Sequence, residues 1–318
     1  MSRKINPMKQ TVILGLLLIV ALSLRAQSVN GNAQIRAGTN ESAIVITTTR
    51  RLAGAIDSLQ WHGREFINSA DHGRQLQSAC SFDNTPEANC ETFNPTEAGS
   101  RLDDVGTHSI SRLLELTASG NRLRTRTQMA FWLAPGERSG GQLARNTNTL
   151  SNYVLTKDVT IGFGRWPQAL DYRVTFSVPA GAHHVSAQFE ALTGYMPPEF
   201  SSFWEFNPAT GKLQPLSDSP GEINNPVVLA TPDGKFAMGI FSPPQTQPDT
   251  SGTQPDTSGP TFGRWKFNVE RVVKWNCVYR VQNPSGIHDG DYKYRMLVPI
   301  GTLAQVEAML RDWRELKW

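Results

Sequence analysis

The sequence predicts an all-β protein, a large antiparallel β-sandwich with a C-terminal helix. Segments in which apolar and polar residues alternate recur along the chain, separated by turns rich in Gly, Pro, Asn and Asp. A helical period is clear only near the C-terminus. No linker separates the strand-like segments into two bodies, so we expect one domain over residues 27–318.

The period-two pattern locates the expected strands. Each segment is rich in β-branched or aromatic residues, which fit a pleated and half-buried surface. The expected strands cover residues 43–49, 122–133, 153–163, 170–178, 182–191, 235–241, 272–281 and 291–299.

The C-terminal segment predicts a helix over residues 303–316. Thr302 and Gln305 have the spacing of a capping box, which satisfies free N–H groups at a helix start. Four apolar residues then fall on one helical stripe, which should pack on a sheet: Leu303, Val306, Leu310 and Trp313.

Residues 1–26 are typical of a signal peptide. Arg3, Lys4 and Lys9 precede an apolar run over residues 11–24, and Ala26 offers a cleavage point. The run is shorter than the roughly 20 residues of a membrane span, although a signal anchor is an alternative. We expect a secreted or periplasmic protein with no membrane contact after cleavage. Without this segment the formal net charge falls from +3 to −1, and no basic cluster predicts nucleic-acid binding.

A short repeat predicts a flexible loop at residues 243–260. Residues 246–252 read TQPDTSG and recur unchanged at residues 253–259. Such a composition buries little apolar surface, and an insertion at a loop tip disturbs no core.

The chain has three cysteines, at positions 80, 90 and 277. In an oxidising compartment Cys80 and Cys90 are expected to form a disulfide, which would stabilise the fold by roughly 2–3 kcal/mol. The alternative is that all three are free and buried. No CxxC or HExxH pattern predicts a zinc site, and no motif predicts a cofactor. A bound calcium ion stays an open alternative, because the side-chain oxygens of scattered Asp and Asn residues are calcium ligands.

Two segments carry a family resemblance. Residues 51–66, RLAGAIDSLQWHGREF, read as a strand, a Gly turn and a second strand, and DYKYRMLVP at residues 291–299 reads as a late strand. The first resembles the opening hairpin of galactose mutarotase-like proteins, and the second resembles their closing region. The resemblance implies a β-supersandwich whose concave face binds carbohydrate. It does not imply mutarotation, because the family's H-x-(Y/W)-F-N motif is absent.

The polar stretch DHGRQLQSAC at residues 71–80 is the first candidate site. In a strand over residues 74–82, Gln75 and Gln77 would share an accessible face where their amides bind sugar hydroxyls. Arg74 would hold the substrate, or pair structurally with an acidic neighbour. His72 would shuttle protons, or pack over a turn.

Three glutamates are the candidate acids and bases. Glu91 and Glu97 lie on one predicted loop, with Asn94 between them as a substrate-binding candidate. Glu205 lies beside Trp204, whose ring would stack on a sugar and raise the pKa of the carboxyl. Paired carboxyl groups cleave glycosidic bonds at separations of about 5–5.5 Å or about 6.5–9.5 Å.

These observations favour a secreted carbohydrate-active protein that cleaves a glycosidic bond by hydrolysis or elimination. The expected partner is a carbohydrate, and a glycoside hydrolase or polysaccharide lyase is the favoured class of enzyme. Two alternatives stay open. The protein is a glycan-binding module without catalysis, or a structural protein of the cell envelope.

Overall fold

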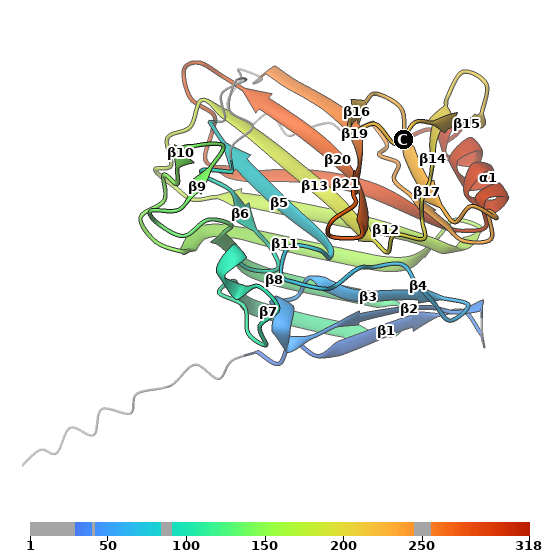
Figure 1. Cartoon of the computed structure of the whole chain (residues 1–318), viewed down its shortest axis with the longest axis horizontal. Helices are drawn as coiled ribbons and strands as arrows, with labels where there is room; N and C mark the ends of the chain where they lie inside the picture. Colours follow the sequence, from blue (N-terminus) through green and yellow to red (C-terminus); the bar gives the residue numbers. More distant parts are fainter. Residues whose placement is uncertain (1–28, 40–41, 84–90, 245–255) are drawn as a thin grey trace, which may run out of the picture.

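A computed structural model describes residues 29–39, 42–83, 91–244 and 256–318. Antiparallel pairing joins nearly all strands into one network, and the chain ends in one α-helix (Figure 1). The predicted fold class, an all-β sandwich with a C-terminal helix, is confirmed. The predicted signal peptide over residues 1–26 lies outside the described residues. No described helix combines the length and the apolar character needed to cross a membrane.

The first layer of the sandwich carries the candidate site. Its strands pair in the spatial order β1 (Ala33–Ala37), β2 (Ile44–Thr48), β3 (Ile56–Trp61), β5 (Leu76–Phe82), β13 (Ser186–Met196), β20 (Val272–Gln282), β19 (Asp256–Phe267) and β16 (Gly221–Ile223).

The second layer packs against the first. Its strands pair in the order β7 (Arg112–Ser119), β8 (Arg122–Phe131), β11 (Leu150–Phe163), β12 (Trp166–Val178), β21 (Gly290–Gly301), β18 (Ala237–Gly239), β17 (Val227–Ala230), β14 (Ser202–Asn207) and β15 (Lys212–Leu216).

Four short strands complete the fold. β6 (Pro95–Thr96) pairs with β5 on one side and β8 on the other, so it links the two layers. β4 (Arg64–Glu65) pairs with β3 and confirms the hairpin predicted over residues 51–66. β9 (Arg138–Ser139) and β10 (Gln142–Leu143) form a separate hairpin.

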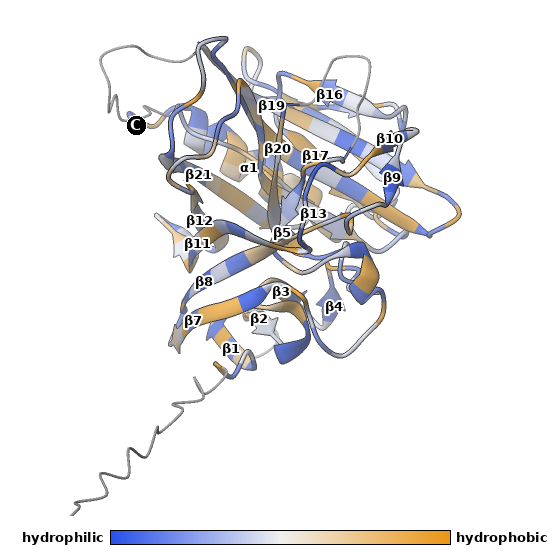
Figure 2. Ribbon diagram, turned by 90° about the vertical axis from the view of Figure 1, so that its left-hand side faces the viewer, coloured by the Kyte–Doolittle hydropathy of each residue, from blue (hydrophilic) through white to orange (hydrophobic). Residues whose placement is uncertain are grey.

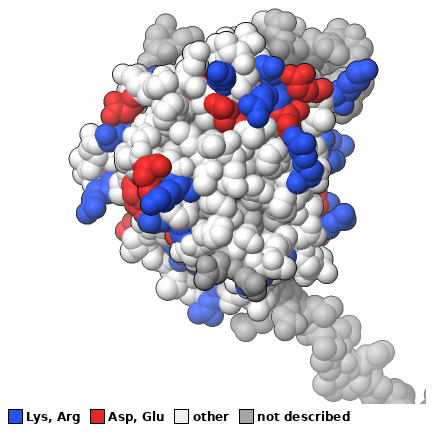
Figure 3. All heavy atoms as spheres, turned by 90° about the vertical axis from the view of Figure 1, so that its right-hand side faces the viewer, with Lys and Arg blue, Asp and Glu red and all other residues white. Residues whose placement is uncertain are grey.

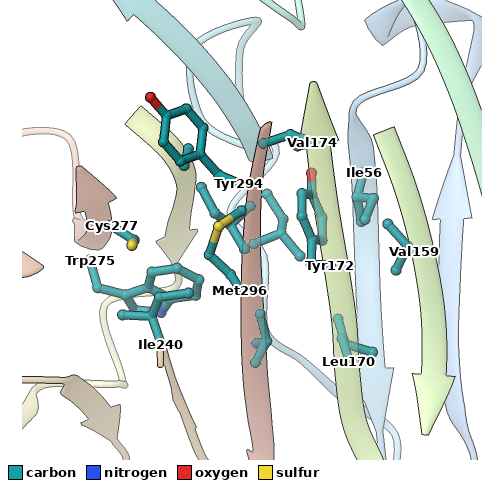
Figure 4. Close-up of a cluster of buried hydrophobic side chains, with 14 of the residues drawn as sticks. Ile56, Val159, Leu170, Tyr172, Val174, Ile240, Trp275, Cys277, Tyr294 and Met296 are labelled. Atoms are coloured by element: carbon teal, nitrogen blue, oxygen red, sulfur yellow. The ribbon is translucent and has the colours of Figure 1, made fainter. Parts of the chain in front are cut away.

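Apolar side chains from both layers fill the space between them. Hydrophobic and hydrophilic residues alternate along many strands, which turns one face of each layer inward (Figure 2). The ring of Tyr279 on β20 stacks on that of Tyr294 on β21, with centroids 4.3 Å apart. Figure 4 shows this core, with Trp275 of the first layer and Met296 of the second among its buried side chains. Burial of this apolar surface is the main force that holds the layers together.

The C-terminal helix α1 (Leu303–Arg314) confirms the helix prediction and ends two residues earlier than expected. The capping box forms as predicted. The Thr302 hydroxyl accepts from the Gln305 N–H at 3.3 Å, and the Gln305 side chain accepts from the Thr302 N–H at 2.9 Å. Val306, Leu310 and Trp313 are buried against the second layer. Figure 3 shows this side of the molecule, where a broad uncharged area lies between groups of mixed charge.

The structure also corrects the bounds of the predicted repeat loop and of one predicted strand. β19 begins at Asp256 and pairs with β20 from that residue, so the end of the loop predicted over residues 243–260 is a strand. Residues 245–255 lie outside the described residues. The strand expected over residues 182–191 starts at Ser186 and continues to Met196.

Candidate functional site

A cleft of about 310 Å³ opens on the outer face of the first layer, over β5, β13 and β20. Charged, amide and aromatic side chains line it, whereas the opposite face of these strands packs into the core. The lining consists of Asp71, Gly73, Arg74, Gln77, Ala79, Glu91, Asn94, Thr96, Trp132, Glu190, Thr193, Tyr195, Phe267, Glu270, Val272 and Lys274.

The alternation of β5 provides the floor of the cleft. Leu76, Cys80 and Phe82 point into the core, as predicted, and the intervening Gln77 and Ala79 line the cleft. Both ends of the Gln77 amide are held by the backbone, since Nε2 donates to the Gly73 carbonyl at 2.9 Å and Oε1 accepts from the Ala98 N–H at 3.1 Å. Gln77 therefore presents a fixed surface to a ligand.

Gly73 allows an indole ring to form one wall. A Cβ atom at position 73 would lie 2.8 Å from Cη2 of Trp132, closer than real contacts allow. A larger residue at position 73 would therefore force the ring or the chain to shift. Trp132 is partly exposed in the cleft, where an aromatic face can stack on a sugar ring.

A β-bulge in β13 places a carboxylate in the cleft. The register of β13 shifts after Glu190 against both neighbouring strands. As a result Ala191 and Leu192 are both fully buried, although they are consecutive. The phase change leaves Glu190 and Thr193 on the same outer face.

Glu190 is held as a charged carboxylate. Its Oε2 atom accepts hydrogen bonds from Thr193 at 2.8 Å, Lys274 at 3.2 Å and Asn276 at 3.4 Å. Burial alone would raise the pKa of Glu190, but attraction to Lys274 and these hydrogen bonds outweigh it and lower the pKa. All three hydrogen bonds described for the Glu190 carboxylate are accepted by Oε2, and none of them is accepted by Oε1.

Glu91 has the opposite electrostatic character. Its side chain is accessible to solvent and lines the cleft, where neighbouring atoms remove part of its hydration. This partial burial raises the pKa of Glu91, and the negative charge of Glu190 raises it further. The charges of Lys274 and Arg101 and a hydrogen bond from Trp132 only partly offset the rise.

Lys274 links the acid to two aromatic rings. Its ammonium lies 5.2 Å from the ring centroid of Tyr195 and 4.9 Å from that of Trp265. Attraction to Glu190 raises the pKa of Lys274 against the effect of burial, so the group stays charged. Gly263 lies under the Trp265 ring, where any Cβ atom would overlap the indole.

Arg74 and Asn94 also reach the cleft, as their predicted binding roles require. The Arg74 Nε lies 3.2 Å from Oδ2 of Asp71, whose Oδ1 accepts from the Gly73 N–H at 2.8 Å. The structural pairing that the sequence left open for Arg74 is therefore present.

Glu97 lies outside the cleft, which corrects its expected catalytic role. Its carboxylate and the Lys157 ammonium form an ion pair at 2.5 Å, and both side chains are completely buried. Lys157 also donates to the Gly54 carbonyl at 2.6 Å, and Glu97 Oε2 accepts from the Ser78 N–H at 3.1 Å. A carboxylate enclosed in this way holds the layers together and cannot reach a ligand.

Gln75, contrary to expectation, and His72, in line with the packing alternative left open for it, are also interior groups. His72 is buried, and its two ring nitrogens lie 2.6 Å and 2.9 Å from the carbonyls of Asp104 and Arg51. Gln75 is fully buried and its amide donates to Ser69 at 3.1 Å. Neither side chain is free to contact a substrate.

Glu205 and Trp204 lie on β14 in the second layer, away from the cleft. Trp204 packs against the cluster of apolar residues that also holds α1. Glu205 is therefore next to Trp204 in the sequence, but neither residue lines the cleft.

The predicted disulfide is not supported. Cys80 is a free thiol buried in the core, and Cys90 lies outside the described residues. Burial raises the pKa of the Cys80 thiol well above its ordinary value, which makes it unreactive. Among the described side chains, no three His, Cys, Asp or Glu residues lie close enough to hold a metal ion.

The pattern of β13 contains the signal for the residues that sequence reasoning missed. In QFEALTGY at residues 188–195 the alternation breaks at Ala191 and Leu192, which indicates a bulge. Reading the strand through that break would have placed Glu190, Thr193 and Tyr195 on one face. Lys274 follows, because it pairs opposite Tyr195 on β20.

No protein-family model matches the chain, and no curated protein matches it. Several solved structures resemble its fold, and many of them are carbohydrate-active enzymes. An alpha-mannosidase from Enterococcus faecalis V583 matches with a TM-score of 0.46 and 11% identity, over 90% of this chain and 32% of its own. A GH36 alpha-galactosidase from Geobacillus stearothermophilus gives 0.42 and 10%, over 87% and 41%.

The Slr1438 protein from Synechocystis sp. PCC 6803 matches with a TM-score of 0.43 and 11% identity, over 85% of this chain and 96% of its own. This chain thus spans well under half of the two enzymes and nearly all of the Slr1438 protein. At these scores the likeness says nothing of what the chain binds.

Proposed function

We propose that the cleft binds a glycan and hydrolyses a glycosidic bond, with Glu91 as the general acid and Glu190 as the general base or nucleophile. The supporting observation is that two carboxyl groups line one cleft and their pKa values are displaced in opposite directions. Glycosidases divide the two roles between carboxyl groups in this way.

The roles follow from the proton each group holds. Glu91, with its raised pKa, donates its proton to the glycosidic oxygen as the bond from that oxygen to the sugar C1 breaks. Glu190 stays ionised and either accepts a proton from the attacking water or attacks C1 itself. Either route adds one water to the two products. The separation of the carboxyl groups in the bound complex decides the stereochemistry.

The walls of the cleft suit a sugar. Trp132 and Tyr195 offer aromatic faces, and the Asn94 amide can exchange hydrogen bonds with hydroxyl groups. We propose that the fold is galactose mutarotase-like, as residues 51–66 suggest, and that residues 1–26 direct export. Sequencing the N-terminus of the protein recovered outside the cytoplasm tests the export proposal.

Mass spectrometry after incubation with a pooled panel of oligosaccharides tests the reaction. Products whose masses include one added water support hydrolysis, and products that carry an unsaturated end would show elimination instead. If the oligosaccharides bind but return intact, the chain is the glycan-binding module left open above. If none binds, the carbohydrate proposal fails.

A further inference from the structure

The charges that line the cleft indicate which glycans it takes. Among the described residues that line it, four carry carboxyl groups, Asp71, Glu91, Glu190 and Glu270, and two are cationic, Arg74 and Lys274. Even with Glu91 protonated, acidic groups outnumber basic ones. The described lining therefore attracts neither carboxylate nor sulfate by its overall charge.

Both cations are already paired. Arg74 lies 3.2 Å from Asp71, and Lys274 lies 3.2 Å from Glu190 while also facing the rings of Tyr195 and Trp265. A ligand carboxylate that recruited either cation would weaken one of these pairs. It would then leave an acidic side chain close to its own negative charge.

We propose that the cleft selects glycans whose bound sugars carry no acidic group, and that it discriminates against uronic acids and sulfated sugars. This inference rests on the proposed glycan-binding function and narrows its substrate class. A neutral sugar places hydroxyl groups against these side chains and an apolar ring face against Trp132, so it disturbs neither ion pair.

The same pairing bears on the reaction. Elimination from a uronate removes the C5 proton beside its carboxylate, and the negative charge that develops there needs a cation or a comparable group to stabilise it. Arg74 and Lys274 are committed to Asp71 and Glu190. Hydrolysis of a neutral glycan makes no such demand, so it is the reaction that this cleft favours.

Matched pairs of oligosaccharides test the selectivity by isothermal titration calorimetry at low salt. The probes are hexamers of glucose, galactose and mannose, each compared with its C6-carboxylated counterpart, with Glu91→Gln used to prevent turnover. In the pair that binds, we expect the neutral member to bind at least about ten-fold more tightly, as like charges a few ångströms apart predict. Equal or tighter binding of the uronate would overturn the inference but leave the proposed function standing. Binding of no hexamer would overturn both.

Asp71→Asn tests the pairing argument directly. Removal of the Asp71 charge frees Arg74 to bind a ligand carboxylate. In the pair of hexamers that binds, the uronate should therefore gain several-fold in affinity, and the neutral hexamer should gain less. Glu205→Gln, on the second layer, removes a charge outside the cleft and serves as the control. If uronate affinity in Asp71→Asn stays within the change seen for the control, the pairing does not set the selectivity. A second variant, Glu270→Gln, should also raise the affinity for the uronate, because it removes another negative charge from the cleft.

Discussion

Glu91 and Glu190 line the same cleft, where burial raises the pKa of Glu91 and the negative charge of Glu190 raises it further. Glu190 itself keeps a lowered pKa because Lys274, Thr193 and Asn276 stabilise its charged form. The two carboxyl groups thus reach different protonation states at the same pH, which is the condition for one to act as acid and the other as base.

Removal of the Glu190 charge should lower the pKa of Glu91. In Glu190→Gln the repulsion disappears, so Glu91 ionises at a lower pH than in the unmodified protein. Carbon-detected NMR titration of the Glu91 carboxyl measures this shift without any substrate. Glu205→Gln, which removes a charge on the second layer, should leave the titration unchanged. An unchanged Glu91 pKa in Glu190→Gln would show that the two groups do not interact.

Truncation of Trp132 should weaken glycan binding. Trp132→Ala removes the aromatic wall and the hydrogen bond to Glu91, so the dissociation constant should rise about ten-fold or more, as loss of an aromatic contact predicts. Trp132→Phe keeps the stacking face and should recover most of the affinity in calorimetric titrations. Equal affinity for all three proteins would rule out stacking at this wall.

The Glu97–Lys157 pair should be essential for stability. Lys157→Met leaves a buried carboxylate without its partner, which should lower the free energy of unfolding by about 3–5 kcal/mol. The double variant Lys157→Met with Glu97→Met removes both charges and should recover much of the loss. Urea unfolding measures all three proteins. Arg124→Met breaks the exposed pair with Asp158 and should cost less than about 1 kcal/mol.

Asp171 should make stability depend on pH in the acidic range. Burial alone would raise its pKa, but the hydrogen bonds and charges of Arg295 and Arg173 outweigh burial and lower it. The stability gained is fully present above the ordinary pKa of about 3.9, and it is lost as pH falls through the lower folded-state value. Urea unfolding between about pH 5 and pH 2 covers the ordinary pKa and the lowered one. Over this range the free energy of unfolding should decline less steeply for Asp171→Asn than for the unmodified protein. Parallel declines would exclude this contribution.

The fold was predictable because its signals are local. Alternation along β5 placed Leu76, Cys80 and Phe82 in the core, and the spacing of Thr302 and Gln305 marked the start of α1. Such patterns need no knowledge of distant contacts. They can therefore be recognised in a single sequence.

The candidate site was only partly predictable, because its partners are distant in the chain. Glu97 was expected on a loop as a candidate acid or base, but it is completely buried and pairs with Lys157 of β11. The signal was present, since Lys157 occupies a core-facing position between Leu155 and Val159 and must have a charged or polar partner. The strand predicted over residues 182–191 ended at the bulge of β13, so the face that Glu190 shares with Thr193 was missed. The break in alternation at Ala191 and Leu192 marks that bulge in the sequence.

The most direct test of the central claim is to compare turnover on the glycan identified by the panel. Glu91→Gln and Glu190→Gln should each lower kcat at least about 100-fold with little change in binding, because each removes a group that moves a proton or attacks C1. Glu205→Gln, outside the cleft, should match the unmodified protein. Full activity in both cleft variants would contradict the claim that these two carboxyl groups cleave the bond.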